Sequence, residues 1–176
     1  IYEFLMIGRR PASYLFVALL GAFLLMLSLG TSKVIAVAGA IAMAFCSYNM
    51  QIIQVGHNTK MQAIAFFPWV LAGVVYTYRC AMAGLKGGYG LYKADGAADQ
   101  NETGKTAIWK SWLPKTVLAS VLFALALSFQ IKANHPQITY YLAIVIFVYA
   151  LTLLIWACVK KEERGRRLTR FFAASA

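Results

Sequence analysis

Five apolar runs dominate the pattern of hydrophobic and polar positions along the chain. They cover residues 11–29, 34–50, 61–79, 113–131 and 137–158. A helix needs about 20 mainly apolar residues to cross the hydrocarbon core of a bilayer, and each run approaches that length. The pattern therefore predicts an all-α, polytopic bundle of about five transmembrane helices.

Two of the runs carry details that affect how they would fold. The second, VIAVAGAIAMAFCSYNM, is short and rich in alanine, which favours close packing against other helices. The third contains Pro68 in the sequence FFPW. Because proline cannot donate the backbone hydrogen bond of a helix interior, Pro68 either kinks the third helix or marks its true start. In the second case, 59–67 would be a separate piece at the membrane interface.

The composition agrees with an integral membrane protein and excludes an ordinary soluble domain. Hydrophobic residues make up 61% of the chain and aromatic residues 14%, whereas soluble domains are nearer one half apolar. Many aromatic side chains stand at the ends of the runs, the level that Trp and Tyr prefer in membranes. Cys46, Cys80 and Cys158 form no CxxC pair, so we expect small packing residues rather than metal ligands.

The net charge of +11 predicts an orientation in the membrane. Basic residues gather in the stretch 79–115 and in the tail 160–170, and the positive-inside rule places both in the cytoplasm. The chain then divides into helices in 1–83, a polar, Gly-rich cytoplasmic linker in 84–112, a helical hairpin in 113–158 and a basic cytoplasmic tail in 159–176. Nucleic acid is not an expected partner, because no basic surface is interleaved with aromatic residues.

With this orientation, two polar motifs fall on the outer face of the membrane. They are GHNTK at 56–60 and KANHPQ at 132–137. Thr59 and Gln62 have the T-x-x-Q spacing of a capping box, and Pro136 suits the first position of a helix, with His135 or Asn134 as its cap. Two helix N-termini would therefore point outward, where their free N–H groups and partial positive charge attract anions.

Hydrogen-bond donors surround these two helix starts, and Glu3 is the only carboxylate expected on that face. Such a set suits a phosphate or pyrophosphate group, and no metal is expected, because two histidines without a nearby carboxylate or thiolate leave zinc short of ligands. The same side chains also have a structural interpretation as caps, snorkelling lysines and interfacial tyrosines. The candidate binding residues are His57, Asn58, Lys60, Lys132, Asn134, His135, Gln137 and Tyr140.

The sequences GHNTKMQAIAFFPWVLAGVVYTYR and ALALSFQIKANHPQITYYL resemble the YfhO-like bacterial membrane proteins, particularly their Bacteroidetes-type members. AGAIAMAFCSYNM is similar to the Gly-Ala-rich helix of the same family, and the resemblance covers 11–80 and 113–160. The first motif is matched by Gly56, His57 and Lys60. The second motif is matched by Asn134, His135, Gln137, Thr139, Tyr140 and Tyr141.

The resemblance implies a multi-pass protein of the bacterial cytoplasmic (inner) membrane, related to the GT-C glycosyltransferases. These enzymes move a sugar from a polyprenyl-phosphate donor to an acceptor outside the membrane. Their catalytic acid lies in a first outer loop, for which this chain offers only Glu3. The chain is therefore expected to be a middle segment that holds the lipid-phosphate end of the donor, with an unknown catalytic residue and unknown cofactors. Its expected partners are membrane lipids, the polyprenyl-phosphate sugar and the rest of the same polypeptide.

Two other functions stay open from the sequence. In a transporter or flippase, His57 and His135 would lie in a translocation path, although the basic residues stand at the ends of the runs. In a non-catalytic membrane scaffold, the inner linker and the basic tail would be the working parts. The tail ends in FFAASA, directly after its basic cluster. We expect FFAASA to begin a further membrane segment.

Overall fold

The described part of the chain is entirely helical. A computed structural model describes residues 12–82, 105–159 and 164–175, with no strand in these ranges and with the backbone alone for 105–112. Four segments are long and apolar enough to cross a membrane, namely 33–54, 58–82, 113–132 and 136–159. The fold class is therefore confirmed as an all-α, multi-pass membrane bundle. The helices are α2 (Ala12–Ser28), α3 (Lys33–Ala44), α4 (Ser47–Gln54), α5 (Asn58–Met82), α6 (Lys105–Lys132), α7 (Pro136–Val159) and α8 (Arg164–Ser175).

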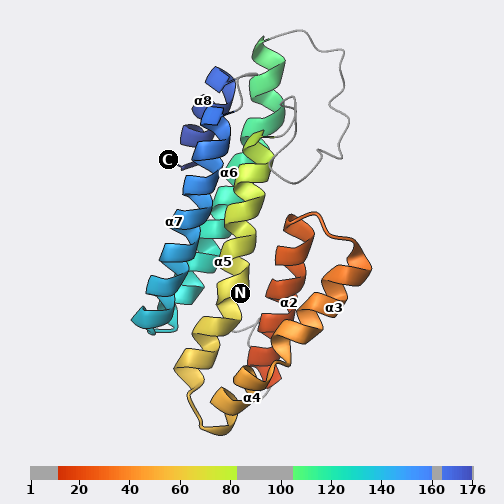
Figure 1. The fold of residues 1–176 in the computed structure, drawn as a ribbon, viewed down its shortest axis with the longest axis vertical. Helices are drawn as coiled ribbons and strands as arrows, with labels where there is room; N and C mark the ends of the chain where they lie inside the picture. The colour runs from red at the N-terminus through yellow and green to blue at the C-terminus, as the bar shows by residue number, and fades with distance from the viewer. Residues whose placement is uncertain (1–11, 83–104, 160–163, 176) are drawn as a thin grey trace.

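Helix α5 is the centre of the bundle. It contacts α2, α4, α6, α7 and α8, and Figure 1 shows it running between α2 and the pair α6 and α7. Within its most apolar window 67% of the residues are buried, compared with 22% in α6 and 17% in α7. The outer surfaces of α6 and α7 therefore face lipid or other helices, as does that of 33–54, where 28% of the window is buried.

The bundle has two ends of different character (Figure 1). The α4–α5 turn lies at the bottom of the view and the α6–α7 turn lies higher, at the lower left, and we call this half of the bundle the histidine end. The C-terminal ends of α5 and α7 lie at the opposite end, together with α8, and we call this the basic end. Both polar motifs are thus at one end of the bundle, as the alternation of helices requires.

Small residues let α5 approach its neighbours closely. A Cβ atom added at Gly21 of α2 would collide with Trp69 of α5, and one at Gly73 of α5 would lie 2.8 Å from the Cα atom of Phe123 in α6. The indole Nε1 of Trp69 also donates to the Val17 carbonyl of α2 at 2.8 Å. Glycine at these positions permits the close contact that membrane helices use in place of a hydrophobic driving force.

Pro68 lies inside α5, which runs without interruption from Asn58 to Met82. The alternative in which the helix starts at Pro68, and 59–67 forms a separate interfacial piece, is therefore wrong. Pro68 is buried, and its ring carbon Cγ lies 3.0 Å from where a Cβ of Gly21 would stand. Packing against α2 stabilises the helix through this position, although the proline cannot donate a hydrogen bond.

The second apolar run is not one helix. It is divided between α3 and α4 at Phe45 and Cys46. The buried Asn49 side chain donates from Nδ2 to the carbonyls of Met43 and Ala44, at 2.9 and 3.1 Å. These are carbonyls at the end of α3 that have no partner within the helix, so the Asn49 amide satisfies them where water is scarce. At about 1.5 Å per residue, the 12 residues of α3 are too short to cross the hydrocarbon core alone.

Helix α6 is longer than the fourth apolar run. It begins at Lys105 and continues through Pro114 to Lys132, so 105–112, which the sequence assigned to the cytoplasmic linker, belongs to a helix. The remainder of that linker lies outside the described residues. The first apolar run forms the 17-residue α2, which is shorter than the four candidate membrane spans.

Basic side chains stabilise helix ends at the basic end. Nη1 of Arg79 donates to the Ser28 carbonyl at the end of α2, at 3.0 Å, and Nη1 of Arg170 donates to the Ala81 carbonyl of α5, at 3.2 Å. The C-terminus of a helix carries free carbonyls and partial negative charge. These carbonyls therefore accept from the guanidinium groups in the way that a carboxylate does in an ion pair. All six acidic residues of the chain lie outside the described ranges.

The tail residues 164–175 form α8, which folds back along α5 and α7. Phe171 stacks on Tyr78 with 5.4 Å between ring centroids, and the Tyr78 hydroxyl is 2.8 Å from the Ser175 hydroxyl. Arg167 lies 4.7 Å from the ring centroid of Trp156. The chain thus turns back toward the middle of the bundle after α7, and whether it continues as another membrane segment stays a prediction.

Candidate functional site

The GHNTK motif is the junction between α4 and α5. Gly56 has a left-handed backbone with φ of 80°. Its N–H donates to the Ile53 carbonyl at 3.0 Å, and the N–H of His57 donates to the Ile52 carbonyl at 3.1 Å. These two bonds form a Schellman motif, which ends α4 and needs glycine at the left-handed position. The glycine of the motif therefore has a structural explanation.

His57 also begins the next helix. Its carbonyl accepts from the Met61 N–H at 3.0 Å, and α5 starts at the following residue, Asn58. Thr59 lies inside the helix, so the predicted capping box of Thr59 and Gln62 does not form, and His57 occupies the cap position instead. His57 and Asn58 are both exposed, with side chains open to the medium at the histidine end.

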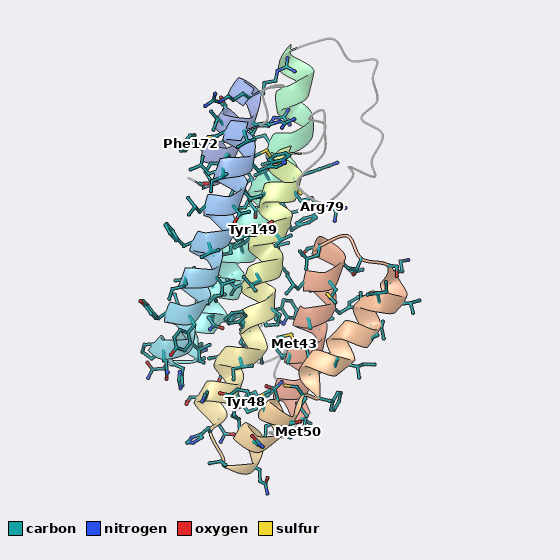
Figure 2. All side chains as sticks on the ribbon, in the orientation of Figure 1. Met43, Tyr48, Met50, Arg79, Tyr149 and Phe172 are labelled. Carbon is teal, nitrogen blue, oxygen red and sulfur yellow. The ribbon has the colours of Figure 1, made fainter. Side chains whose placement is uncertain are left out.

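Lys60 makes a contact that its sequence position did not suggest. Its ammonium nitrogen lies 5.4 Å from the centroid of the Tyr48 ring of α4. Figure 2 shows Tyr48 on α4 at the histidine end, next to the start of α5. A cation above an aromatic face at this distance contributes about 0.5–1 kcal/mol at an exposed site. Lys60 therefore helps to join α4 to α5, and it is half-buried rather than fully solvated.

The KANHPQ motif repeats the same construction between α6 and α7. Asn134 has a left-handed backbone with φ of 51°, and its N–H donates to the Ile131 carbonyl at 2.9 Å. His135 follows, and its carbonyl accepts from the N–H groups of Ile138 and Thr139 at 3.2 and 3.3 Å. Helix α7 begins at Pro136, as predicted. Each motif thus has a left-handed residue, then a histidine, then the start of a membrane helix.

The two histidine side chains have different environments. His57 is exposed, whereas His135 is half-buried and its Nδ1 is buried without a hydrogen-bond partner in the described part of the chain. A buried imidazole nitrogen normally has a partner. The position beside the start of α7 therefore has an unmet hydrogen-bonding group that a bound molecule, a water or another segment could satisfy.

The remaining predicted residues surround the α6–α7 turn. Lys132 is exposed at the end of α6, and Gln137 and Tyr140 are exposed in the first turn and a half of α7. Gln137 donates from Nε2 to the Tyr141 hydroxyl at 3.0 Å, and the ring centroids of Tyr140 and Tyr141 are 6.1 Å apart. Gln137, Tyr140 and Tyr141 therefore interact with one another along α7. Lys60, which belongs to the other motif, interacts with Tyr48 of α4.

One buried polar residue near this site was missed from the sequence. Gln130 of α6 has no exposed surface, and neither its Nε2 nor its Oε1 has a hydrogen-bond partner among the described residues. It lies one turn after Ala126, which packs with Val70 of α5 and Leu142 of α7. Within an apolar run a single glutamine gives little signal, because its burial depends on which helix face meets the neighbours.

An apolar groove is the second feature that the sequence did not indicate. It has a volume of about 500 Å³ and lies between α2, α5 and α6. Apolar side chains form most of its wall, including Leu24 of α2, Phe66 of α5 and Leu122 of α6, and Arg79 is the only charged residue among the described residues that line it. Figure 2 shows Arg79 on α5 beside the end of α2.

The described residues contain no group of three or more His, Cys, Asp or Glu side chains that could hold a metal ion. Cys46, Cys80 and Cys158 are all free thiols. The candidate residues at the histidine end are hydrogen-bond donors, two imidazoles and lysine cations, and they belong to two separate helix junctions. No family model, curated protein or solved structure matches the chain.

Proposed function

We propose that the histidine end binds the phosphate of a polyprenyl-phosphate lipid on the extracytoplasmic side of a bacterial inner membrane. The chain would contribute this site to a GT-C-related, YfhO-like glycosyltransferase. The observation that carries the proposal is the repeated junction, in which His57 and His135 each precede the start of a membrane helix at the same end of the bundle. Free N–H groups at helix starts, two imidazoles and the lysines Lys60 and Lys132 suit an anion.

The described residues supply groups for one of the two chemical requirements of glycosyl transfer. An inverting transfer needs a carboxylate base for the acceptor hydroxyl and donors that stabilise the leaving phosphate. The histidine end offers donors, and Nδ1 of His135, which has no partner among the described residues, adds one when it carries the ring proton. No carboxylate occurs in the described ranges, so a base would have to come from other residues.

A non-catalytic scaffold is the competing function, and a specific observation favours it. Gly56 and Asn134 are both required by the left-handed turns that end α4 and α6, and Lys60 has a structural contact with Tyr48. The motifs could therefore be helix junctions alone. The two functions differ in whether the charge of Lys60 matters for binding.

The test is the affinity of the purified protein for polyprenyl phosphate at two salt concentrations. We expect Lys60→Gln to weaken binding by about 1–3 kcal/mol, the range for a charge-assisted hydrogen bond, with a smaller loss for Lys60→Arg and a smaller effect at high salt. Lys33→Gln is the matched control, because Lys33 is exposed at the start of α3, away from both motifs. Tyr48→Leu removes the ring contact but keeps the cation. Equal affinity for wild type and Lys60→Gln would leave GHNTK as a helix junction alone.

A further inference from the structure

The groove between α2, α5 and α6 has the dimensions of a site for one lipid chain. It extends along α5 from Phe66 to Arg79, which is roughly 20 Å at about 1.5 Å per residue. One leaflet of the hydrocarbon core is about 15 Å thick, half of the total. The groove also opens sideways, since its α6 wall includes Leu122 and Leu125, which are 50% and 38% exposed. A hydrocarbon chain could therefore enter from the bilayer.

The polar groups of the groove gather where it ends at the basic end. Arg79 and Tyr76 line this part. Lys115 of α6 lies at a similar level, because α5 and the antiparallel α6 meet at Gly73 and Phe123. Arg79 and Lys115 stand six and eight residues from this contact, both toward the basic end. In the described part of the chain no carboxylate balances these two cations.

Arg79 has hydrogen-bonding capacity beyond its structural contact. Within the described residues, its hydrogen bonds to the Leu27 and Ser28 carbonyls both leave from Nη1. Nη2 and Nε remain, and a guanidinium presents its donors in a planar fork that fits a phosphate. Two further polar side chains of the wall have internal partners. Nε1 of Trp69 donates to the Val17 carbonyl, and the Ser28 hydroxyl donates to the Leu25 carbonyl.

We propose that this groove binds an anionic glycerophospholipid of the cytoplasmic leaflet. One acyl chain lies along α5 between Phe66 and Tyr76, and the phosphate is held by Arg79 and Lys115. The charge complementarity selects an anionic headgroup, because basic pockets between membrane helices on the cytoplasmic side bind such lipids. The volume of about 500 Å³ is within the roughly 300–1,000 Å³ that small-ligand pockets occupy. This site does not depend on the function proposed for the histidine end.

The experiment measures lipids retained by the purified protein in native mass spectrometry, after exchange into vesicles of phosphatidylglycerol mixed with phosphatidylethanolamine. We expect preferential retention of phosphatidylglycerol. Lys115→Gln should reduce its retention about tenfold, the size of one charge-assisted hydrogen bond. Arg79→Gln should reduce it further, although this variant also loses the contact with the end of α2.

A variant that fills the groove tests the contribution of the acyl chain to binding separately from that of the headgroup. Leu125→Trp adds bulk on the groove wall and should abolish the retention of phosphatidylglycerol. Leu118→Trp is its control, because Leu118 is a 61% exposed residue of α6 that does not line the groove. Equal retention of both phospholipids, or no effect of Lys115→Gln and Leu125→Trp, would overturn the proposal. The proposal would also be overturned if the groove retained added polyprenyl phosphate more strongly than phosphatidylglycerol. The same holds if a protein segment occupied the groove and excluded all lipids from it.

Discussion

At the scale of single residues, Gln130 has both polar atoms of its side chain buried without a hydrogen-bond partner among the described residues. Its whole amide is buried on the face of α6 that packs against α5 and α7, and neither amide atom has a partner there. A buried amide without a hydrogen bond costs about 1–3 kcal/mol. A residue that lowers stability in this way is a candidate for contact with a ligand or an ordered water.

Replacing Gln130 by leucine should therefore stabilise the protein. Because Leu buries no unpaired polar atom, Gln130→Leu should raise the free energy of unfolding by about 1–3 kcal/mol, measured as a higher thermal midpoint in detergent. Gln137→Leu is the control, since Gln137 is exposed and should change the midpoint little. A lower midpoint for Gln130→Leu would mean that the amide has a partner, such as a bound water, that stabilises the fold.

The sequence predicted the chemistry of the turns better than the environment of each side chain. Polar residues that interrupt apolar runs are easy to recognise, so His57 and His135 were found. The sequence placed a cap at His135 or Asn134, but it placed the other cap at Thr59 instead of His57. It did not show that Gly56 and Asn134 end the preceding helices in left-handed conformations. The burial of Gln130 could not be predicted, since it depends on helix rotation within the bundle.

At the scale of helices, close backbone contacts hold α5 in the centre. Gly73 meets the backbone of Phe123 in α6, whereas the indole of Trp69 fills the space beside Gly21 of α2. The hydropathy pattern located α5, α6 and α7, but it joined α3 and α4 into one run. The division depends on Asn49, whose side-chain amide donates to carbonyls at the end of α3. A single asparagine in an apolar run does not indicate such a contact.

Gly73→Ala tests the contact between α5 and α6. The new methyl group would lie 2.8 Å from the Cα atom of Phe123, and backbone cannot move aside as a flexible side chain can. We expect a loss of about 1–3 kcal/mol in the free energy of unfolding, the usual cost of overpacking. Gly165→Ala is the matched control, because a Cβ there meets nothing within 4 Å and alanine favours the helix by up to about 1 kcal/mol. Equal effects of the two changes would show that α5 and α6 are not in close contact.

Asn49→Leu tests the joint between α3 and α4. The change removes two hydrogen bonds to buried carbonyls, which should cost about 2–3 kcal/mol when each net contribution is near 1 kcal/mol. The measurement is the thermal midpoint in detergent, together with hydrogen exchange of the amides in α4. Ser47→Ala, at an exposed position of α4, is the control. Unchanged exchange and stability in Asn49→Leu would mean that the joint does not depend on the amide.

At the scale of the whole molecule, the bundle has hydrogen-bond donors of two helix starts at one end and basic side chains that stabilise helix ends at the other. The alternation of apolar runs was sufficient to predict that both motifs share one end, because each crossing reverses the chain. It could not predict the groove between α2, α5 and α6, which arises from three helices distant in sequence. Both proposed sites require the histidine end to be extracytoplasmic and the basic end to be cytoplasmic.

The most direct test of this account is the sidedness of the two ends in intact cells. Single cysteines at Thr59, Gln137 and Gly165, placed in a protein with Cys46, Cys80 and Cys158 replaced by alanine, are exposed to a membrane-impermeant thiol reagent. We expect Thr59→Cys and Gln137→Cys to react in intact cells and Gly165→Cys to react only after permeabilisation, because the positive-inside rule holds the basic end in the cytoplasm. Labelling of Gly165→Cys in intact cells, or labelling of Thr59→Cys and Gln137→Cys from opposite sides, would contradict the account.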